Sequence, residues 1–193
     1  MTVAMPLEPV PPPILDPLLR YWQERRASLP LPPRSAIDPI EMGGPMLPYL
    51  LLTDLLDRGT RVRFRLVGTA VVKRLGFDPT GRYLDADLAG AWGTFFGTLH
   101  RLLYAERAPI RAESEVEWGE GRRMQIAHLL LPLTQDGPDP AIALVGLHFA
   151  TREAFPRTLA VDARTWRHTE LNRAILKSLP VIERPRIIGR DVA

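Results

Sequence analysis

The sequence predicts an α+β protein in which helices cover one face of an antiparallel sheet. Arg61–Val67 alternates charged and apolar side chains with the period of two that is typical of a half-buried strand. Apolar residues between positions 92 and 103 recur at spacings of three and four, as on one face of a helix. Along the chain, the predicted order is a helix, two strands, short helices, a long helix and three strands.

Composition limits both the architecture and the chemistry. With 193 residues and 46% apolar content, the chain is long enough for one globular core with extensions at its ends. It contains no cysteine, which excludes disulfides, thiolate metal sites, cysteine nucleophiles and flavin photochemistry through a cysteine adduct. The start lacks a signal-peptide pattern, and no stretch approaches the roughly 18 apolar residues of a membrane span. We therefore expect a cytoplasmic protein that does not enter the membrane.

The first 48 residues precede the predicted sheet. Residues 1–16 are rich in proline and predict a flexible arm with polyproline character. Asp16 followed by Pro17 is typical of a helix start, and apolar residues at helical spacing extend this helix to Leu29. Six prolines from Pro30 to Pro48 exclude a helix interior or a central strand there. Residues 17–48 are thus expected to form one helix and a connector.

Two strands joined by a tight turn follow. They cover Tyr49–Leu56 and Arg61–Val67, and the intervening Asp57–Thr60 contains turn-forming Asp and Gly. The second strand is expected to bury one face and to expose three arginines on the other. The side chains expected to point inward are Val62, Phe64 and Leu66.

The second half of the core contains the long helix and three strands. The helix ends before Pro109, which cannot continue it. Residues 111–118 then alternate, and the loop 119–121 predicts a hairpin in which Trp118 opposes Arg122 and Ala112 opposes His128. The nearly continuous apolar run Ala141–Ala150 is typical of a strand in the middle of a sheet.

Beyond residue 150 the alternation ends. The segment from 162 to 179 predicts a weak helix within a C-terminal extension, residues 151–193. Helices that flank a core often mediate dimerisation, and either flanking helix has the alternative role of capping the sheet. The residues expected at such an interface are Leu18, Trp22, Trp166 and Leu171.

Several short pieces of sequence carry a family resemblance. They are the pair Tyr21 and Trp22, the segment 34–39, the pair Leu47 and Pro48, the stretch Arg63–Thr69, the positions Gly76, Asp78, Thr80 and Gly81, and Leu130–Leu133. With this element order, the chain resembles the PAS domain superfamily and, more narrowly, a family of stand-alone bacterial PAS-like proteins. The resemblance implies a PAS-like core over residues 49–150, a five-stranded sheet in the spatial order 2-1-5-4-3, and helices around a small internal cavity.

His128 is the first candidate for a pocket residue. The predicted hairpin register places its side chain on the buried face, where an imidazole needs hydrogen-bond partners. It is expected to bind a ligand, to sense pH near neutrality or to be a core histidine satisfied by a backbone carbonyl, and we favour the last of these. The other expected pocket residues are Val116, Trp118, Met124, Ile126, Phe96 and Leu99.

The remaining histidines give no metal site. His100 lies on the long helix, where haem-binding PAS proteins often place the axial ligand, but helix geometry puts it about 100° from the centre of the apolar stripe. We therefore expect a histidine at the border of the buried face, with haem ligation as the weaker alternative. No HxxxH or HxH spacing is present.

Charge patterns on two strands suggest partner surfaces. Arginines alternate along Arg61–Val67 and glutamates along residues 111–118, and the PAS strand order puts these strands on opposite edges of the sheet. The two rows are then either borders available to other chains or simply solvated surfaces.

PAS domains usually sense or dimerise, so the resemblance implies a stand-alone sensory and interaction module without catalysis. Such a module binds a small ligand or a protein partner and signals through altered association, here as a homodimer whose output is carried by another protein. No cofactor is predicted. One alternative is a small enzyme that uses His128 with Asp85, Asp87 or Glu113. A nucleic-acid binder is disfavoured because no recognition motif accompanies the arginines Arg20, Arg25, Arg26, Arg122 and Arg123.

Overall fold

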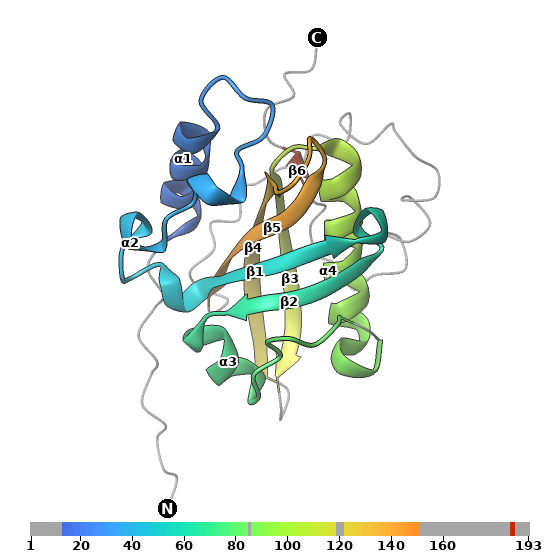
Figure 1. Ribbon diagram of the computed structural model, residues 1–193. Helices are drawn as coiled ribbons and strands as arrows, with labels where there is room; N and C mark the ends of the chain where they lie inside the picture. The colour runs from blue at the N-terminus through green and yellow to red at the C-terminus, as the bar shows by residue number, and fades with distance from the viewer. Residues whose placement is uncertain (1–12, 85, 119–121, 151–185, 188–193) are drawn as a thin grey trace, which may run out of the picture.

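A computed structural model describes residues 13–84, 86–118, 122–150 and 186–187 of the chain. Its centre is a six-stranded antiparallel sheet in the order β2-β1-β5-β4-β3-β6, and Figure 1 shows α1 and α4 on opposite sides of it. The strands are β1 (Leu50–Leu56), β2 (Arg61–Val67), β3 (Ile110–Trp118), β4 (Arg122–Thr134), β5 (Pro140–Ala150) and β6 (Arg186–Ile187). The helices are α1 (Leu15–Arg26), α2 (Pro39–Met42), α3 (Thr69–Leu75) and α4 (Ala86–Glu106), with single 3-10 turns η1 (Arg34–Ala36), η2 (Leu47–Tyr49) and η3 (Asp57–Gly59).

The predicted spatial order 2-1-5-4-3 is confirmed, with one addition. The short strand β6 pairs with Ile110 and Arg111 at the outer edge of β3, a strand that the sequence did not indicate. The predicted helix 162–179, with Trp166 and Leu171, lies outside the described residues, as does the first part of the predicted arm. None of the described helices is long and apolar enough to cross a membrane.

The main core lies between α4 and one face of the sheet. The predicted apolar stripe of this helix is confirmed by the buried side chains of Phe95, Phe96, Leu99, Leu102 and Leu103. The helix is longer than its stripe, because it begins at Ala86, and it ends at Glu106, before Pro109. Alternate residues of β1, β4 and β5 face this core, so the strands fix one set of side chains beneath α4.

A second core lies between α1 and the opposite face of the sheet. Leu18 is fully buried, and Trp22 is 2% exposed while its Nε1 donates a 3.0 Å hydrogen bond to the carbonyl of Pro132. Gly146 on β5 makes room for the helix, because a Cβ there would lie 2.7 Å from Leu18 Cδ2. Contrary to expectation, Leu18 and Trp22 therefore present no exposed interface; α1 takes the alternative role and caps the sheet.

The bounds of α1 differ from the prediction Pro17–Leu29. The helix begins two residues earlier, at Leu15, and its cap position is Ile14 instead of Asp16. Pro17 is tolerated there because the N–H groups of the first helical turn have no partner within the helix. The helix ends at Arg26, since Ala27 adopts a positive φ of 47°.

A β-bulge corrects the predicted alternation of β2. Thr53 pairs with Phe64 but Leu52 pairs with Leu66, so Arg65 is an extra residue on β2. Beyond the bulge the faces exchange: Leu66 joins the α1 side of the sheet and is 48% exposed. The expectation that Leu66 is a core residue is wrong for this reason.

The hairpin of β3 and β4 follows the predicted register. Trp118 pairs with Arg122, and Ala112 pairs with His128. His128 therefore lies on the face covered by α4, as predicted.

The outer edge of β2 is less accessible than the sequence suggested. Residues 81–84 run beside it, with hydrogen bonds from Phe64 N to Arg82 O (2.9 Å) and from Leu84 N to Val62 O (2.9 Å). Gly81 begins this segment with a φ of 83°, a conformation that favours glycine. The backbone of this part of the basic border is thus already paired within the chain, and its arginine side chains remain exposed on the α1 side.

Candidate functional site

Two fully buried histidines lie between α4 and the sheet. His128 comes from β4, and His100 comes from α4. Phe96 lies against both rings, with centroid distances of 4.4 Å to His100 and 6.2 Å to His128. The face of the sheet and one helix therefore hold two imidazoles in a mainly apolar core.

One nitrogen of His128 has a partner and the other has none among the described residues. Nε2 lies 2.8 Å from the hydroxyl oxygen of Ser114 on the neighbouring strand β3. Nδ1 is buried and has no hydrogen-bond partner in the described part of the chain. The rings of Phe95 and His128 pack in a T-shaped arrangement with their centroids 5.4 Å apart. An unsatisfied buried polar atom costs about 1–3 kcal/mol, so this nitrogen is an exception that needs an explanation.

The observed partner differs from the reading that the sequence favoured. A backbone carbonyl was expected to satisfy His128, whereas its partner is the hydroxyl of Ser114. A hydroxyl both donates and accepts, so it can pair with either tautomer of the imidazole. The unpartnered Nδ1 is accordingly an acceptor when Nε2 is protonated and a donor when it is not.

His100 contrasts with His128, because both of its nitrogens have partners. Nδ1 lies 2.7 Å from the carbonyl oxygen of Phe96, and Nε2 lies 2.8 Å from Oγ1 of Thr53 on β1. A carbonyl only accepts, so Nδ1 carries the proton and Nε2 accepts from the Thr53 hydroxyl. An iron atom would have to displace one of these hydrogen bonds, which disfavours the haem ligand that was weighed from the sequence.

The expected position of His100 at the border of the buried face is wrong. The turn η3 covers that flank of α4, and a Cβ at Gly59 would lie 3.0 Å from the backbone oxygen of His100 and 2.9 Å from Cβ of Tyr104. Gly59 has a positive φ of 78°, so the close approach and the backbone conformation both favour glycine. The imidazole itself contacts Thr53 on β1, a distant segment that a helical projection of α4 alone does not include.

Both imidazoles are neutral at pH 7. Burial lowers the pKa of His100 to about 4, although the Phe96 carbonyl acts in the opposite direction. Burial, together with a smaller effect of the nearby His100, lowers the pKa of His128 to about 3. The pair therefore offers hydrogen bonds without charge at physiological pH.

The structure brings together four of the predicted pocket residues. All four are buried: Phe96 and Leu99 lie on α4, and Ile126 and His128 lie on β4 beneath it. The structure describes the strand pairing of three others, Val116, Trp118 and Met124, but not their side chains. Sequence reasoning missed three residues of the site, namely Thr53, Phe95 and Ser114. Ser114 could have been found from its place among the inward-facing residues of β3. The signal for Thr53 was a polar residue within a run of leucines.

The acid and base pair that an enzyme would need is not assembled from Glu113 and His128. Glu113 pairs with Ala127, a residue of the α1-side core, so Glu113 and His128 belong to opposite faces of the sheet. Asp85 and the side chain of Asp87 lie outside the part of the chain that the structure describes. Within the described ranges, no group of three or more His, Asp or Glu residues is placed to hold a metal ion.

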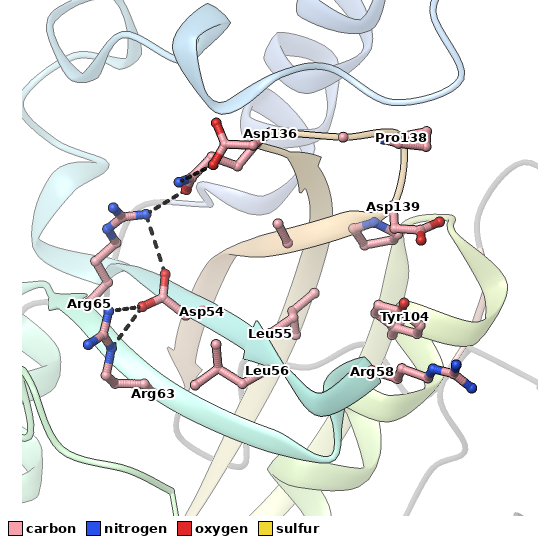
Figure 2. Close-up of a pocket in the computed structure, with 14 residues that line it drawn as sticks. Asp54, Leu55, Leu56, Arg58, Arg63, Arg65, Tyr104, Asp136, Pro138 and Asp139 are labelled. Atoms are coloured by element: carbon pink, nitrogen blue, oxygen red, sulfur yellow. Dashed lines mark hydrogen bonds and ion pairs between the residues drawn. The ribbon is translucent and has the colours of Figure 1, made fainter.

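A second polar feature lies at one end of the sheet, on its α1 side. Asp54 on β1 accepts hydrogen bonds from Arg63 Nε (2.9 Å) and Nη2 (2.7 Å), and its other oxygen lies 3.3 Å from Arg65 Nη1. Figure 2 shows Asp54 between these two arginines, beside a hollow of about 500 Å³. Arg65 also donates to Gln135 Oε1 (3.1 Å), so this arginine links β2 to the loop after β4.

Comparisons with known proteins found one matching family model and a similar solved structure. A family model described as a PAS domain matches residues 12–148, a range that includes α1 and the connector as well as most of the sheet. The structure of the PAS domain from Bordetella pertussis BvgS is similar at 17% identity and a TM-score of 0.41, and the match covers 54% of this chain and 78% of that one. A comparison with curated proteins found no match. The chain therefore belongs to the PAS domain family.

Proposed function

We propose that this protein is a sensory PAS module that binds a small molecule beside His128, has no catalysis of its own and signals through altered association with other chains. The single observation that supports the ligand is Nδ1 of His128, which is buried and has no partner among the described residues. A ligand group that pairs with this nitrogen would remove an unfavourable contribution of about 1–3 kcal/mol.

The surroundings of His128 favour a particular ligand chemistry. Apart from Ser114 and His100, the described surroundings are aromatic and aliphatic side chains of the core beneath α4. The imidazole is neutral at pH 7, because burial lowers its pKa to about 3. Such a site favours an uncharged and mostly apolar molecule with one hydrogen-bonding group. A carbonyl, hydroxyl or amine on the ligand meets this requirement, since Nδ1 donates or accepts according to the tautomer.

The signalling step in this proposal is a shift between two states of association. PAS domains in general are sensory and interaction modules, which supports this role. A ligand shifts such an equilibrium only by its differential affinity for the two states. We propose a homodimer in the cytoplasm as the sensing form, with a separate protein as the recipient of the signal.

Mass spectrometry of one preparation tests the ligand directly. The wild-type protein is incubated with a small-molecule extract, freed of unbound compounds, and measured under native and denaturing conditions. The proposal predicts an added mass under native conditions that is lost on denaturation. A native mass equal to that of the bare chain after this incubation would contradict it.

Two variants place the ligand. The His128→Leu protein should lose the added mass, because the substitution removes the unpartnered nitrogen and replaces the imidazole with an apolar side chain of comparable size. His148→Leu is the matched control, since His148 pairs with Ala127 on the α1 side of the sheet and lies away from the proposed site. Retention of the ligand by His128→Leu would contradict a site at His128.

A further inference from the structure

The α1 side of the sheet is only partly covered by helix. The main contacts of α1 with the sheet are with β4 and β5, at the middle of the sheet. Nearer β2, the connector lies close to the sheet, held by the hydrogen bond from Thr134 N to Pro32 O (3.1 Å) and by a bridge between Pro33 and Thr134. A hollow of about 550 Å³ lies there, which we name the Leu66 hollow. Its lining residues are Pro33, Arg34, Ser35, Leu52, Arg65, Leu66, Gln135 and Asp136.

The apolar part of this hollow is a product of the bulge in β2. Leu52 is 9% exposed and belongs to the α1-side core, while the paired Leu66 is 48% exposed. Without the extra residue Arg65, the alternation of β2 would direct Leu66 toward the core beneath α4. The bulge thus leaves a large aliphatic side chain at the wall of a surface hollow, where burial against another molecule would be favourable.

The polar part of the hollow carries excess positive charge. Arg34 donates from Nη1 to the carbonyl of Ile37 (2.9 Å) and has no acidic partner among the described residues. Arg65 shares the single carboxylate of Asp54 with Arg63, so these three residues together retain one positive charge. Asp136 contributes the one negative charge of the lining itself.

The neighbouring edge of β2 extends this positive surface. Arg61 is exposed and lies 3.9 Å above the centroid of the ring of Tyr83, with no carboxylate partner in the described part of the chain. One face of the Tyr83 ring is therefore covered by a guanidinium group and is not free for a nucleobase to stack on. An exposed aliphatic side chain among arginines favours a polypeptide over a nucleic acid.

We propose that the Leu66 hollow is a docking site for an acidic peptide segment of a partner protein. An aliphatic side chain of the partner packs against Leu66 and Leu52, and its neighbouring carboxylates pair with Arg34 and Arg65. The arginines steer and orient the acidic segment, and the apolar contact adds affinity. The proposal goes beyond the ligand site, because docking in this hollow requires no molecule at His128.

The experiment is a titration of the ¹⁵N-labelled full-length chain, followed by amide chemical shifts. The probe is the synthetic peptide acetyl-DLEDLE-amide, and the charge control is acetyl-KLKKLK-amide. The acidic peptide is expected to shift the amides of Ser35, Leu52 and Leu66 with a saturable curve, and the lysine peptide is expected to leave them unchanged.

Variants then separate the apolar and the charged contributions. Leu66→Ser is expected to weaken binding of the acidic peptide about tenfold, the equivalent of about 1.4 kcal/mol. Arg34→Gln is expected to weaken it about three- to tenfold, and Arg20→Gln on the exposed side of α1 is the matched control with no change. Because Leu66 and Arg34 are not core residues, each variant should keep the dispersed amide spectrum of a folded protein.

Defined outcomes overturn the proposal. One is the absence of shifts at the hollow with up to millimolar acidic peptide. Another is equal binding of the lysine peptide, which would remove the charge argument. A third uses a single-stranded oligothymidylate: if it binds through Arg34 more tightly than the acidic peptide, and Leu66→Ser has no effect, the surface is a nucleic-acid site instead.

Discussion

Acid should destabilise this protein through its two buried histidines. Burial lowers the pKa of His100 to about 4 and that of His128 to about 3 in the folded state, whereas an unfolded histidine has a pKa of about 6.5. Both folded-state values lie below the unfolded value, so unfolding takes up protons as the pH falls below about 6.5. The contribution of the two neutral histidines to the free energy of unfolding is therefore complete above that pH and is lost progressively as the pH falls toward 4 and 3.

The size of the effect follows from these values. One pKa unit corresponds to about 1.36 kcal/mol, so lowering the pH from 8 to 5 removes about 2 kcal/mol for each histidine that stays neutral when folded. His100 and His128 together give a loss of about 4 kcal/mol. Typical domains have total stabilities of about 5–15 kcal/mol, so the loss is large enough to measure easily.

The assay is urea unfolding between pH 8 and pH 5 at constant ionic strength, followed by tryptophan fluorescence. His128→Leu should lose only about half as much stability as the wild type over this range, because one titrating group is gone. Carboxylates that titrate near pH 5 act in both proteins and cancel in the difference. A wild-type loss below about 1 kcal/mol, or equal losses in the two proteins, would refute the reasoning.

Two further predictions concern the packing of α1 on the sheet. Gly146→Ala should destabilise the protein by about 1–3 kcal/mol in urea unfolding, because the new Cβ would lie 2.7 Å from Leu18 Cδ2. Gly137→Ala is the control, since no atom lies within 4 Å of a Cβ there. Equal effects of the two variants would contradict the close contact. Trp22→Phe should lower the free energy of unfolding by about 1–3 kcal/mol in the same assay, because it removes the 3.0 Å hydrogen bond to the carbonyl of Pro132 and reduces the packed volume. An unchanged midpoint of urea unfolding would show that this bond contributes nothing.

The order of elements along the chain and the register of the β3–β4 hairpin were predictable because their signals are local. The alternation of β3 and the short loop 119–121 together fix which residues oppose one another, and this register correctly placed His128 on the buried face. The resemblance to PAS domains supplied the spatial order of the strands, which alternation alone does not determine.

The errors have physical causes that lie outside a single segment. Leu66 fits the period of two, and the bulge that turns it outward is defined only by pairing with β1. A helical projection places His100 at the border of the apolar stripe, whereas its side chain is fully buried and contacts β1 through Thr53. Its hydrogen bond to Thr53 joins residues 47 positions apart, a contact for which the sequence holds no local signal.

The most direct test of the central claim is a long-range ¹H–¹⁵N spectrum of the histidine side chains at pH 7. It is recorded on the protein with its ligand and again after the ligand has been removed by denaturation and refolding. The Nδ1 resonance of His128 is expected to change with the ligand, while both nitrogens of His100 keep the shifts of a neutral ring protonated at Nδ1. An unchanged His128 resonance in a protein that demonstrably binds a small molecule would contradict the proposed site.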